Sequence, residues 1–263
     1  MYKKIALLLI LVMFVFCGCV KPQKEPVPST LDDITKRGSV IIGVKTDTYP
    51  FGFKDKNGKY AGYDVDLANM IGEQIFGKKG KVKFVPVTAS DRMMKLFSED
   101  VDMVVATMSV TPARLQILDF SDPYYIAGQA VLVKRGSKIK GIRDLNGKKA
   151  IIVFGTSSEG SLRAAVPNVS IIGYKTYSEA VKGLKQGKAD AIVSDDTILI
   201  GLSLKDGSLV MLPKRYSREP YAVAFRKGEE SEDLVRVVND VINEAAHNGT
   251  LRKLQKNYGI KKY

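Results

Sequence analysis

The sequence predicts an α/β protein in which helices connect parallel strands, and three observations support this class. Apolar, β-branched runs that suit buried strands alternate with helical segments in the order βαβαβ across residues 40–106. A second series of the same kind follows in the other half of the chain. Residues 101–107 are also echoed by residues 189–195, since each segment has a small or β-branched residue, then Asp, an apolar run and a polar residue. The echo is either a chance match or the mark of two similar lobes, with Thr107 and Asp195 at equivalent strand ends facing one cleft.

In the first half of the chain, strands are expected at three apolar runs: 40–45, 82–87 and 101–106. The first run delivers polar residues into a loop at its carboxyl end, where ligands collect in open α/β sheets. Asp64 is expected to cap one helix, and Ser90 is expected to cap a short second helix that carries Arg92.

The second half of the chain shows the same alternation. Strands are expected at five runs: 127–134, 150–153, 169–173, 189–194 and 221–226. Helices are expected at 178–186, 197–204 and 233–247, and Asn248-Gly249 ends the last of them.

Composition indicates a globular chain with room for two modest cores, since 45% of its 263 residues are hydrophobic and 26% are charged. The net charge of +13 favours anionic ligands or an anionic membrane face. A nucleic-acid partner is not expected, because the basic residues are scattered and no aromatic stacking platform is interleaved with them.

Residues 1–19 read as a leader. Lys3 and Lys4 precede an apolar run, 5–16, that is too short for a comfortable membrane span but suits a secretory signal. The run ends in Phe-Cys-Gly-Cys, which resembles a bacterial lipobox although Phe16 and Cys17 depart from its usual residues. We expect a lipid-modified Cys19, with an ordinary signal peptide or an uncleaved anchor as alternatives. Each version places the rest of the chain outside the cytoplasm.

Residues 20–30 are Pro-rich and polar and are expected to form a tether. Residues 20–263 contain no cysteine, which excludes a disulfide, a thiolate catalyst or a Cys-ligated metal there. The single histidine, His247, lies near the end of a predicted helix and reads as a helix C-terminal cation rather than a base. No metal and no cofactor are expected.

Residues 106–122 read as an anion-binding corner between a strand end and a short helix. Thr107 and Ser109 supply hydroxyls, and a threonine cap and a proline precede Arg114 in the first helical turn. A cation at the positive end of a helix dipole is explained if an anion lies between them. The alternative is an arginine paired with a neighbouring carboxylate, Asp119 or Asp122, and these residues alone leave both interpretations open.

From residue 31 onward the chain resembles the extracellular solute-binding proteins of family 3, the polar amino-acid-binding proteins of ABC importers. The segments that carry the resemblance are GVKTDTYPFGF, GYDVDLA, ATMSVTPAR with DFSDPYY, GTSSEG, GKADAIVSDD and LRKLQKNYG. The resemblance implies a type II periplasmic-binding-protein fold, in which a ligand cleft lies between two α/β lobes joined by two hinge strands. Lobe 1 would hold residues 31–125 and 222–263, and lobe 2 would hold residues 126–221.

The resemblance also implies how an amino acid is held. Arg114 would bind the α-carboxylate with Ser109, helped by Thr156 or Ser157 from lobe 2, and Thr107 would contribute nearby. Asp195 would accept the α-ammonium group. The implied partners are a free L-amino acid and the membrane permease of an ABC importer, for a monomer that is periplasmic or lipid-anchored to the outer face of the cell membrane.

The resemblance points to an acidic ligand. Lys45 and Arg92 match basic positions of the aspartate/glutamate receptors, whereas Asp47 matches an acidic position of the histidine and glutamine receptors. Two cations against one carboxylate favour glutamate or aspartate, with glutamine or a broader polar range second. The alternative interpretation makes Lys45 and Arg92 a solvated surface pair.

Ala89 departs from the family pattern, since many relatives have a large apolar residue there to cover the ligand. The pocket wall is then expected to come from aromatic residues: Tyr49, Phe51 or Phe154.

An enzyme on the same fold is the main rival, because exported cyclohexadienyl dehydratases resemble these receptors. Such an enzyme needs a general acid in the cleft, and Glu159 or Asp196 is the nearby candidate. No nucleophile elbow and no phosphate loop occurs in the sequence. We therefore expect a binding protein without catalytic residues.

Overall fold

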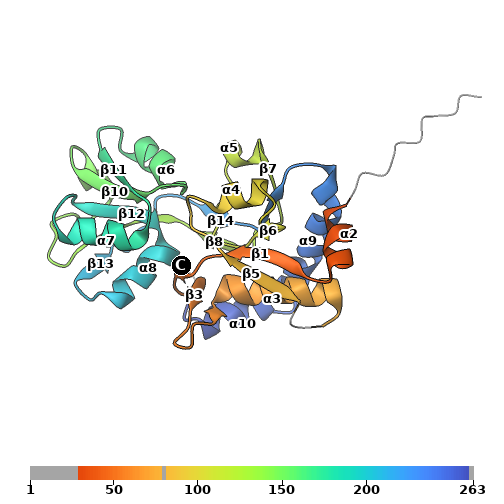
Figure 1. The fold of residues 1–263 in the computed structure, drawn as a ribbon. Helices are drawn as coiled ribbons and strands as arrows, with labels where there is room; N and C mark the ends of the chain where they lie inside the picture. The colour runs from red at the N-terminus through yellow and green to blue at the C-terminus, as the bar shows by residue number, and fades with distance from the viewer. Residues whose placement is uncertain (1–28, 79–80, 261–263) are drawn as a thin grey trace, which may run out of the picture.

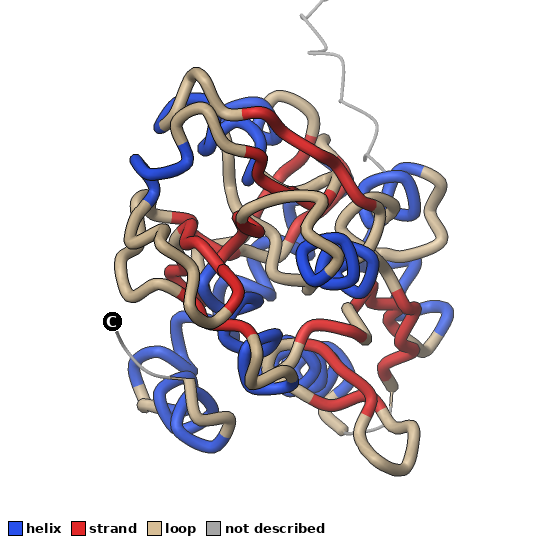
Figure 2. Tube along the Cα trace, turned by 90° about the vertical axis from the view of Figure 1, so that its left-hand side faces the viewer, coloured by secondary structure: helices blue, strands red, loops and turns tan. Residues whose placement is uncertain are grey.

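The computed structural model describes residues 29–78 and 81–260, which form two lobes side by side (Figure 1). The predicted leader with Cys19 and most of the predicted tether lie outside the described residues. Figure 2 shows the molecule from the side of the second lobe, with helices and loops around the strands. No helix in the described ranges is long and apolar enough to cross a membrane.

The first lobe is built on a sheet with strand order β5-β1-β6-β15-β7. Its strands are β1 (Val40–Val44), β5 (Val82–Pro86), β6 (Met103–Val104), β7 (Leu118–Phe120) and β15 (Ala224–Arg226). Its helices are α2 (Thr30–Arg37), α3 (Tyr63–Phe76), α4 (Arg92–Phe97), α5 (Pro112–Leu115), η2 (Glu229–Ser231), α9 (Glu232–His247) and α10 (Thr250–Asn257). Leu67 of α3 and Val238 of α9 share one apolar core, and Leu96 of α4 lies in another.

The second lobe is built on a sheet with strand order β11-β10-β12-β9-β13. Its strands are β9 (Gln129–Lys134), β10 (Lys149–Val153), β11 (Ser170–Tyr174), β12 (Ala191–Asp195) and β13 (Leu209–Met211). Its helices are η1 (Ile142–Leu145), α6 (Ser158–Ala165), α7 (Tyr177–Lys185) and α8 (Asp196–Lys205). Leu184 of α7 and Leu199 of α8 share one core, and Leu162 of α6 lies in another.

Two short strands connect the lobes. β8 (Tyr125–Ala127) leads into the second lobe, β14 (Glu219–Tyr221) returns from it, and the two pair antiparallel. A small three-stranded sheet, β2 (Asp47–Thr48), β3 (Gly52–Lys54) and β4 (Tyr60–Ala61), extends from the end of β1. The two-lobed type II fold with a pair of hinge strands is therefore what the chain adopts.

The predicted strands are found with changes at three places. The run 101–106 forms only the short β6, whereas 127–134 divides into β8 and β9, and 221–226 divides into β14 and β15. The divisions fall where the chain passes from the hinge ladder into a lobe, because each half pairs with a different partner strand.

Two predicted helix caps are wrong and one is confirmed. Gly62 precedes α3, so Asp64 lies in the first turn with a buried carboxylate instead of at the cap. Asp91, not Ser90, precedes α4. Thr111 does cap α5, since its side chain accepts a hydrogen bond from the Arg114 backbone N–H.

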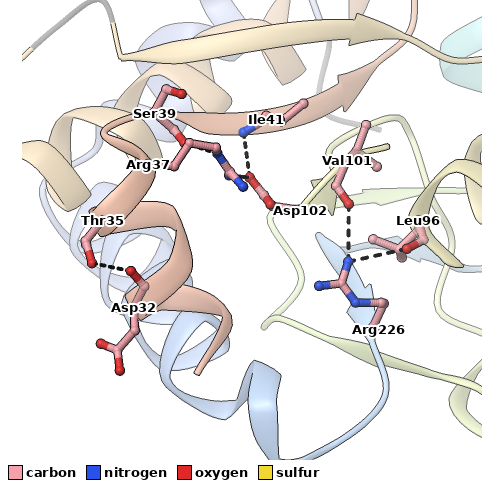
Figure 3. A network of polar contacts seen from close by, with 9 residues as sticks. All are labelled: Asp32, Thr35, Arg37, Ser39, Ile41, Leu96, Val101, Asp102 and Arg226. Atoms are coloured by element: carbon pink, nitrogen blue, oxygen red, sulfur yellow. Dashed lines mark hydrogen bonds and ion pairs between the residues drawn. The ribbon is translucent and has the colours of Figure 1, made fainter. Parts of the chain in front are cut away.

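A polar network attaches α2 to the first lobe (Figure 3). The Asp102 carboxylate accepts hydrogen bonds from the Arg37 guanidinium and from the backbone N–H of Ile41, 2.7 Å away. Nearby, Arg226 Nη1 donates to the carbonyls of Leu96 and Val101, both at 3.4 Å. These bonds connect the first helix, β1, the loop before β6, and β15.

Candidate functional site

Arg114 projects from α5 toward the second lobe. Its Nη1 donates to the Ser109 carbonyl at 2.6 Å, and its Nη2 donates to the Gly155 carbonyl, across the cleft, at 2.9 Å. Asp119 and Asp122 are engaged elsewhere, by the Gly228 backbone N–H and by Asn243. The alternative of a local ion pair is therefore not what the structure shows. Burial, and then the nearby Arg92, lower the pKa of Arg114, and the group remains a cation.

Lys45 and Arg92 are both buried, each with 2% of its surface exposed, so the interpretation as a solvated surface pair is wrong. Lys45 Nζ lies 5.4 Å from the ring centre of Tyr177 in the second lobe. Burial, followed by repulsion from Arg92, lowers the pKa of Lys45 to about 8.

Backbone carbonyls hold the Arg92 guanidinium. Nη1 donates to Ala106 at 2.6 Å and to Thr107 at 3.3 Å, and Nη2 donates to Gly155 at 3.1 Å. Nε is buried without a hydrogen-bond partner among the described residues. Arg92 and Arg114 thus meet at one carbonyl of the second lobe.

Asp195 ends β12 and is 5% exposed. Its Oδ2 accepts from the Tyr221 hydroxyl at 2.6 Å, and its Oδ1 accepts from Gln129 Nε2 at 2.5 Å. Burial raises the pKa of Asp195 to about 7; the Tyr221 bond opposes this shift and the charge of Glu219 adds to it. A cation beside this carboxyl group would favour its ionised form.

The two hydroxyls predicted to help bind a carboxylate donate elsewhere. Thr156 Oγ1 donates to the Val153 carbonyl at 2.7 Å, and Ser157 Oγ donates to Glu219 Oε2, on hinge strand β14, at 2.9 Å. A hydroxyl has one hydrogen to donate, so in this arrangement neither is free for a ligand carboxylate.

Thr107 and Ser109 are buried between β6 and α5. Thr107 has a positive φ of 46°, and its backbone N–H donates to Asp64 Oδ2 at 2.9 Å. The Tyr124 hydroxyl donates to Asp64 Oδ1 at 3.0 Å, so this buried carboxylate holds the unusual backbone. Thr107 Oγ1 has no hydrogen-bond partner within the described part of the chain.

Two glycines of the second lobe touch backbone of the first. A Cβ on Gly155 would lie 2.1 Å from the Ala89 carbonyl oxygen, and a Cβ on Gly201 would lie 2.1 Å from the Tyr49 carbonyl oxygen. Ala89 itself packs in a core cluster of the second lobe. The lobes are thus closed on one another, and Gly155 occupies the space beside Ala89.

The predicted aromatic walls lie in different places. Tyr49 and Phe51 line a cavity of about 240 Å³ together with Thr197 and Ile200 of α8. Phe154 is 48% exposed and lines a separate hollow beside β11 and α7, with none of the other predicted ligand residues. The expectation that Phe154 walls the ligand site does not fit this position. Asp47 is exposed, and it accepts a hydrogen bond from the Thr48 hydroxyl.

Sequence reasoning missed four residues that surround the predicted ones: Asp64 as a buried carboxylate, Gln129, Tyr177 and Glu219. Gln129 and Glu219 are polar residues that open short hinge-side strands, which is a weak signal in a single sequence. Tyr177 follows a threonine cap and reads as an ordinary core aromatic. Among the described residues, no group of three or more His, Cys, Asp or Glu side chains is arranged to hold a metal ion.

Comparison with known proteins identifies the family. The family model of the bacterial extracellular solute-binding proteins, family 3, matches residues 40–261. The chain is 35% identical over 238 residues to the ABC transporter glutamine-binding protein GlnH of Bacillus subtilis, covering 90% of this chain and 86% of that protein. It is 29% identical over 236 residues to the glutamate/aspartate import solute-binding protein of Salmonella typhimurium, covering 86% and 78%.

Solved structures of amino-acid-binding proteins have a similar fold. The cysteine-binding protein of Campylobacter jejuni is similar with a TM-score of 0.81 at 30% identity, covering 88% of this chain and 92% of that one. An ancestral amino-acid-binding protein described as a precursor of cyclohexadienyl dehydratase is similar with a TM-score of 0.77 at 36% identity, covering 88% and 99%.

Proposed function

The chain belongs to the bacterial extracellular solute-binding proteins, family 3, and from this premise we propose that its ligand is an acidic L-amino acid, glutamate or aspartate, delivered to the permease of an ABC importer. The observation that carries the proposal is the burial of two cations, Lys45 and Arg92, where the lobes meet: Arg92 shares the Gly155 carbonyl with Arg114, and Lys45 senses the charge of Asp195.

The charged α-carboxylate and α-ammonium groups of a free amino acid would pair with two opposite charges of the site. Arg114 on the first lobe suits the α-carboxylate, and Asp195 on the second suits the α-ammonium group. In the closed lobes the Gly155 carbonyl accepts a hydrogen bond from Arg114. We therefore expect the guanidinium to bind both this carbonyl and the ligand carboxylate. A charge-assisted hydrogen bond contributes about 1.5–3 kcal/mol, so a few of them support micromolar affinity, which corresponds to about 8 kcal/mol.

The remaining charges favour a side-chain carboxylate. Repulsion from Arg92 is the second cause, after burial, of the lowered pKa of Lys45, so the two cations lie close enough to disfavour one another. The Asp64 carboxylate bonds to Thr107 and Tyr124, and its charge, with those of Asp47 and Asp195, offsets only part of the fall in the pKa of Lys45. An anionic ligand group beside Lys45 and Arg92 would relieve their repulsion, whereas a glutamine amide would leave it in place. Glutamine is therefore the second candidate.

Neither candidate general acid suits catalysis. Glu159 forms an exposed ion pair with Arg163, one turn along α6. Asp196 is paired with Arg215 and also accepts from the Gly128 backbone N–H at 3.1 Å. Burial raises the pKa of Asp196 against the opposing charge of Arg215, but both of its carboxylate oxygens are already engaged by the protein. We therefore propose that the protein binds its amino acid without converting it.

Calorimetric titration of the purified protein with glutamate, aspartate, glutamine, arginine and cystine tests the proposal. We expect the acidic amino acids to bind with micromolar or better affinity, and glutamine to bind at least about tenfold more weakly. Heat from none of them would remove the receptor function. Product formed from prephenate or arogenate would support the dehydratase instead.

Paired variants test the assigned ligand class. Arg92→Ala and Lys45→Met should each weaken acidic ligands at least about tenfold while changing glutamine binding little. Equal losses for all ligands would contradict the acidic assignment. Exposed Lys54, which lies outside the cleft over the ring of Tyr60, provides a matched control as Lys54→Met.

The leader belongs to the same proposal. An importer's receptor acts on the outer side of the membrane, and an acylated Cys19 followed by a polar tether would keep it there. Intact-mass measurement of the protein from the membrane fraction should show a diacylated or triacylated N-terminal cysteine. A Cys19→Ala variant should then be released from that fraction.

A further inference from the structure

Gln129 is a buried polar residue of the second lobe that takes no part in the predicted ligand contacts. It opens β9 and has no exposed surface. Its Nε2 donates to Asp195 Oδ1 at 2.5 Å and to Ser157 Oγ at 3.3 Å. Its Oε1 is buried and has no hydrogen-bond partner in the described part of the protein. A buried amide oxygen without a donor is disfavoured and needs an explanation.

The orientation of this amide is determined by its surroundings. Gln129 lies directly opposite Asp195 in the antiparallel pairing of β9 with β12, so both side chains stand on the same face of the sheet. Its backbone is bonded to Ser217 and Tyr216. Turning the amide over would place Oε1 against the Asp195 carboxylate, acceptor against acceptor. Oε1 therefore remains the unpaired atom.

An α-ammonium group needs more acceptors than Asp195 alone offers. It carries three N–H donors, while each Asp195 oxygen already accepts one hydrogen bond, from Gln129 or from Tyr221. A further acceptor close to Asp195 is required for the third hydrogen. Gln129 Oε1 belongs to the amide that already contacts Asp195, so it lies close to the carboxylate and can accept a hydrogen bond.

We propose that Gln129 Oε1 accepts a hydrogen bond from the α-ammonium group of the ligand, so that Asp195 and Gln129 hold this group together. The inference rests on the proposed function only in requiring a ligand with a free α-ammonium group. It assigns Gln129 a role in selectivity, because it favours primary amino acids over N-substituted amino acids and over dicarboxylates without an amine.

A cycle that combines a protein variant with a ligand variant tests the contact. Calorimetry compares L-glutamate with N-methyl-L-glutamate, which lacks one N–H, on the wild type and on Gln129→Met, which is nearly isosteric and has no amide. We expect Gln129→Met to weaken L-glutamate about tenfold. N-methylation should weaken binding to the wild type by a similar factor or more, but should cost the variant far less.

The same cycle separates a direct contact from an indirect one. If Gln129 acted only by orienting Asp195, N-methylation would cost the wild type and the variant equally, and the proposal would be overturned. Gln129→Asn, whose shorter amide cannot span the same distance, should repeat the Gln129→Met result if the first variant folds poorly. Gln186→Met, at an exposed glutamine of the same lobe, should leave all affinities unchanged.

Failure of the proposed function gives a different result. A wild type that binds neither L-glutamate nor L-glutamine would remove the receptor function. If it binds L-glutamine alone, the acidic assignment fails, and L-glutamine with its N-methyl derivative takes the place of the glutamate pair. A wild type that binds, with Gln129→Met equal to it, overturns only the role of Gln129.

Discussion

The two lobes repeat one plan and differ at the position that faces the cleft. In the first lobe β5, β1, β6, β15 and β7 follow one another across the sheet, and β11, β10, β12, β9 and β13 hold the same places in the second. In both sheets the first three strands pair in parallel and the last two antiparallel. Along the chain, the last two strands of each sheet lie next to the hinge strands β8 and β14. Each sheet is therefore completed by the segments that lead to and from the hinge.

The sequence echo corresponds to a shared hydrogen-bond pattern. Asp102 accepts from the Ile41 backbone N–H at 2.7 Å, and Asp190 accepts from the Lys149 backbone N–H at 2.9 Å. In each pair the aspartate also donates its own backbone N–H to the carbonyl of the same neighbour, at 2.8 Å. Of the two interpretations of the echo, the structure supports two similar lobes.

Five residues after each aspartate, the lobes diverge. β12 continues to Asp195 because four residues pair with β9, whereas β6 ends at Val104 and pairs with β15 at one residue. Without a continuous partner strand, Thr107 turns to a positive φ and offers its carbonyl to Arg92. One strand end thus presents a carboxylate, whereas its counterpart offers its carbonyl to the Arg92 guanidinium and its N–H to Asp64. With Arg92 and Arg114 on the first lobe and Asp195 on the second, this is the arrangement that we propose complements a zwitterion.

The largest expected effect comes from removing a positive charge of the first lobe. Arg114→Ala removes the guanidinium assigned to the α-carboxylate, and it should lower the affinity for every amino acid by on the order of 1,000-fold. Calorimetry with glutamate and glutamine measures it. An affinity for either ligand within a few fold of the wild type would contradict the assignment.

The next effect concerns closure of one lobe on the other. Gly155→Ala would place a Cβ against the Ala89 carbonyl, at a residue whose φ is +77°, and should hold the lobes apart. We expect affinity to fall about 100-fold and small-angle scattering to show less compaction on adding ligand. Gly187→Ala, at a residue of the same lobe whose φ is +75° and where a Cβ would meet nothing within 4 Å, is the matched control. Unchanged affinity for Gly155→Ala would mean that the lobes bind without this contact.

A smaller effect compares the two aspartates of the shared pattern. Asp102 is buried and paired with Arg37, whereas Asp190 is exposed. Asp102→Ala should lower the free energy of unfolding by about 2–3 kcal/mol, and Asp190→Ala by less than about 1 kcal/mol. Urea unfolding measures both. Equal losses would show that burial does not distinguish the two copies.

The smallest expected effect is the pH dependence of ligand affinity that Asp195 of the second lobe causes. The pKa of Asp195 is raised to about 7, so in the unliganded protein a proton competes with the ligand's ammonium group below that pH. Affinity should therefore fall as pH falls through 7, approaching tenfold per pH unit at most. Lys45, with a pKa of about 8, stays largely protonated there, whereas Asp64, with a pKa of about 6, also titrates.

Calorimetry at pH 8 and pH 6 measures this dependence. Asp195→Asn should remove the part that belongs to Asp195 and leave any part from Asp64. An affinity that does not change between the two pH values would contradict the assignment. Without ligand the dependence of stability has the opposite sign: native Asp195 keeps a proton that the unfolded chain has already lost, so the free energy of unfolding falls as pH rises from about 4 to about 7.

The sequence by itself determined the fold class, the strand and helix order and the helix that begins after Thr111, because these depend on local periodicity and capping. It also indicated the equivalence of residues 101–107 and 189–195. Tertiary structure decided what local pattern does not encode. It divided the hinge runs by their partner strands, buried Lys45 and Arg92 instead of leaving them in solvent, and turned Phe154 away from the other predicted ligand residues. It also brought Gln129 against Asp195, because that contact depends on the register of β9 with β12, two strands 66 residues apart at this pair.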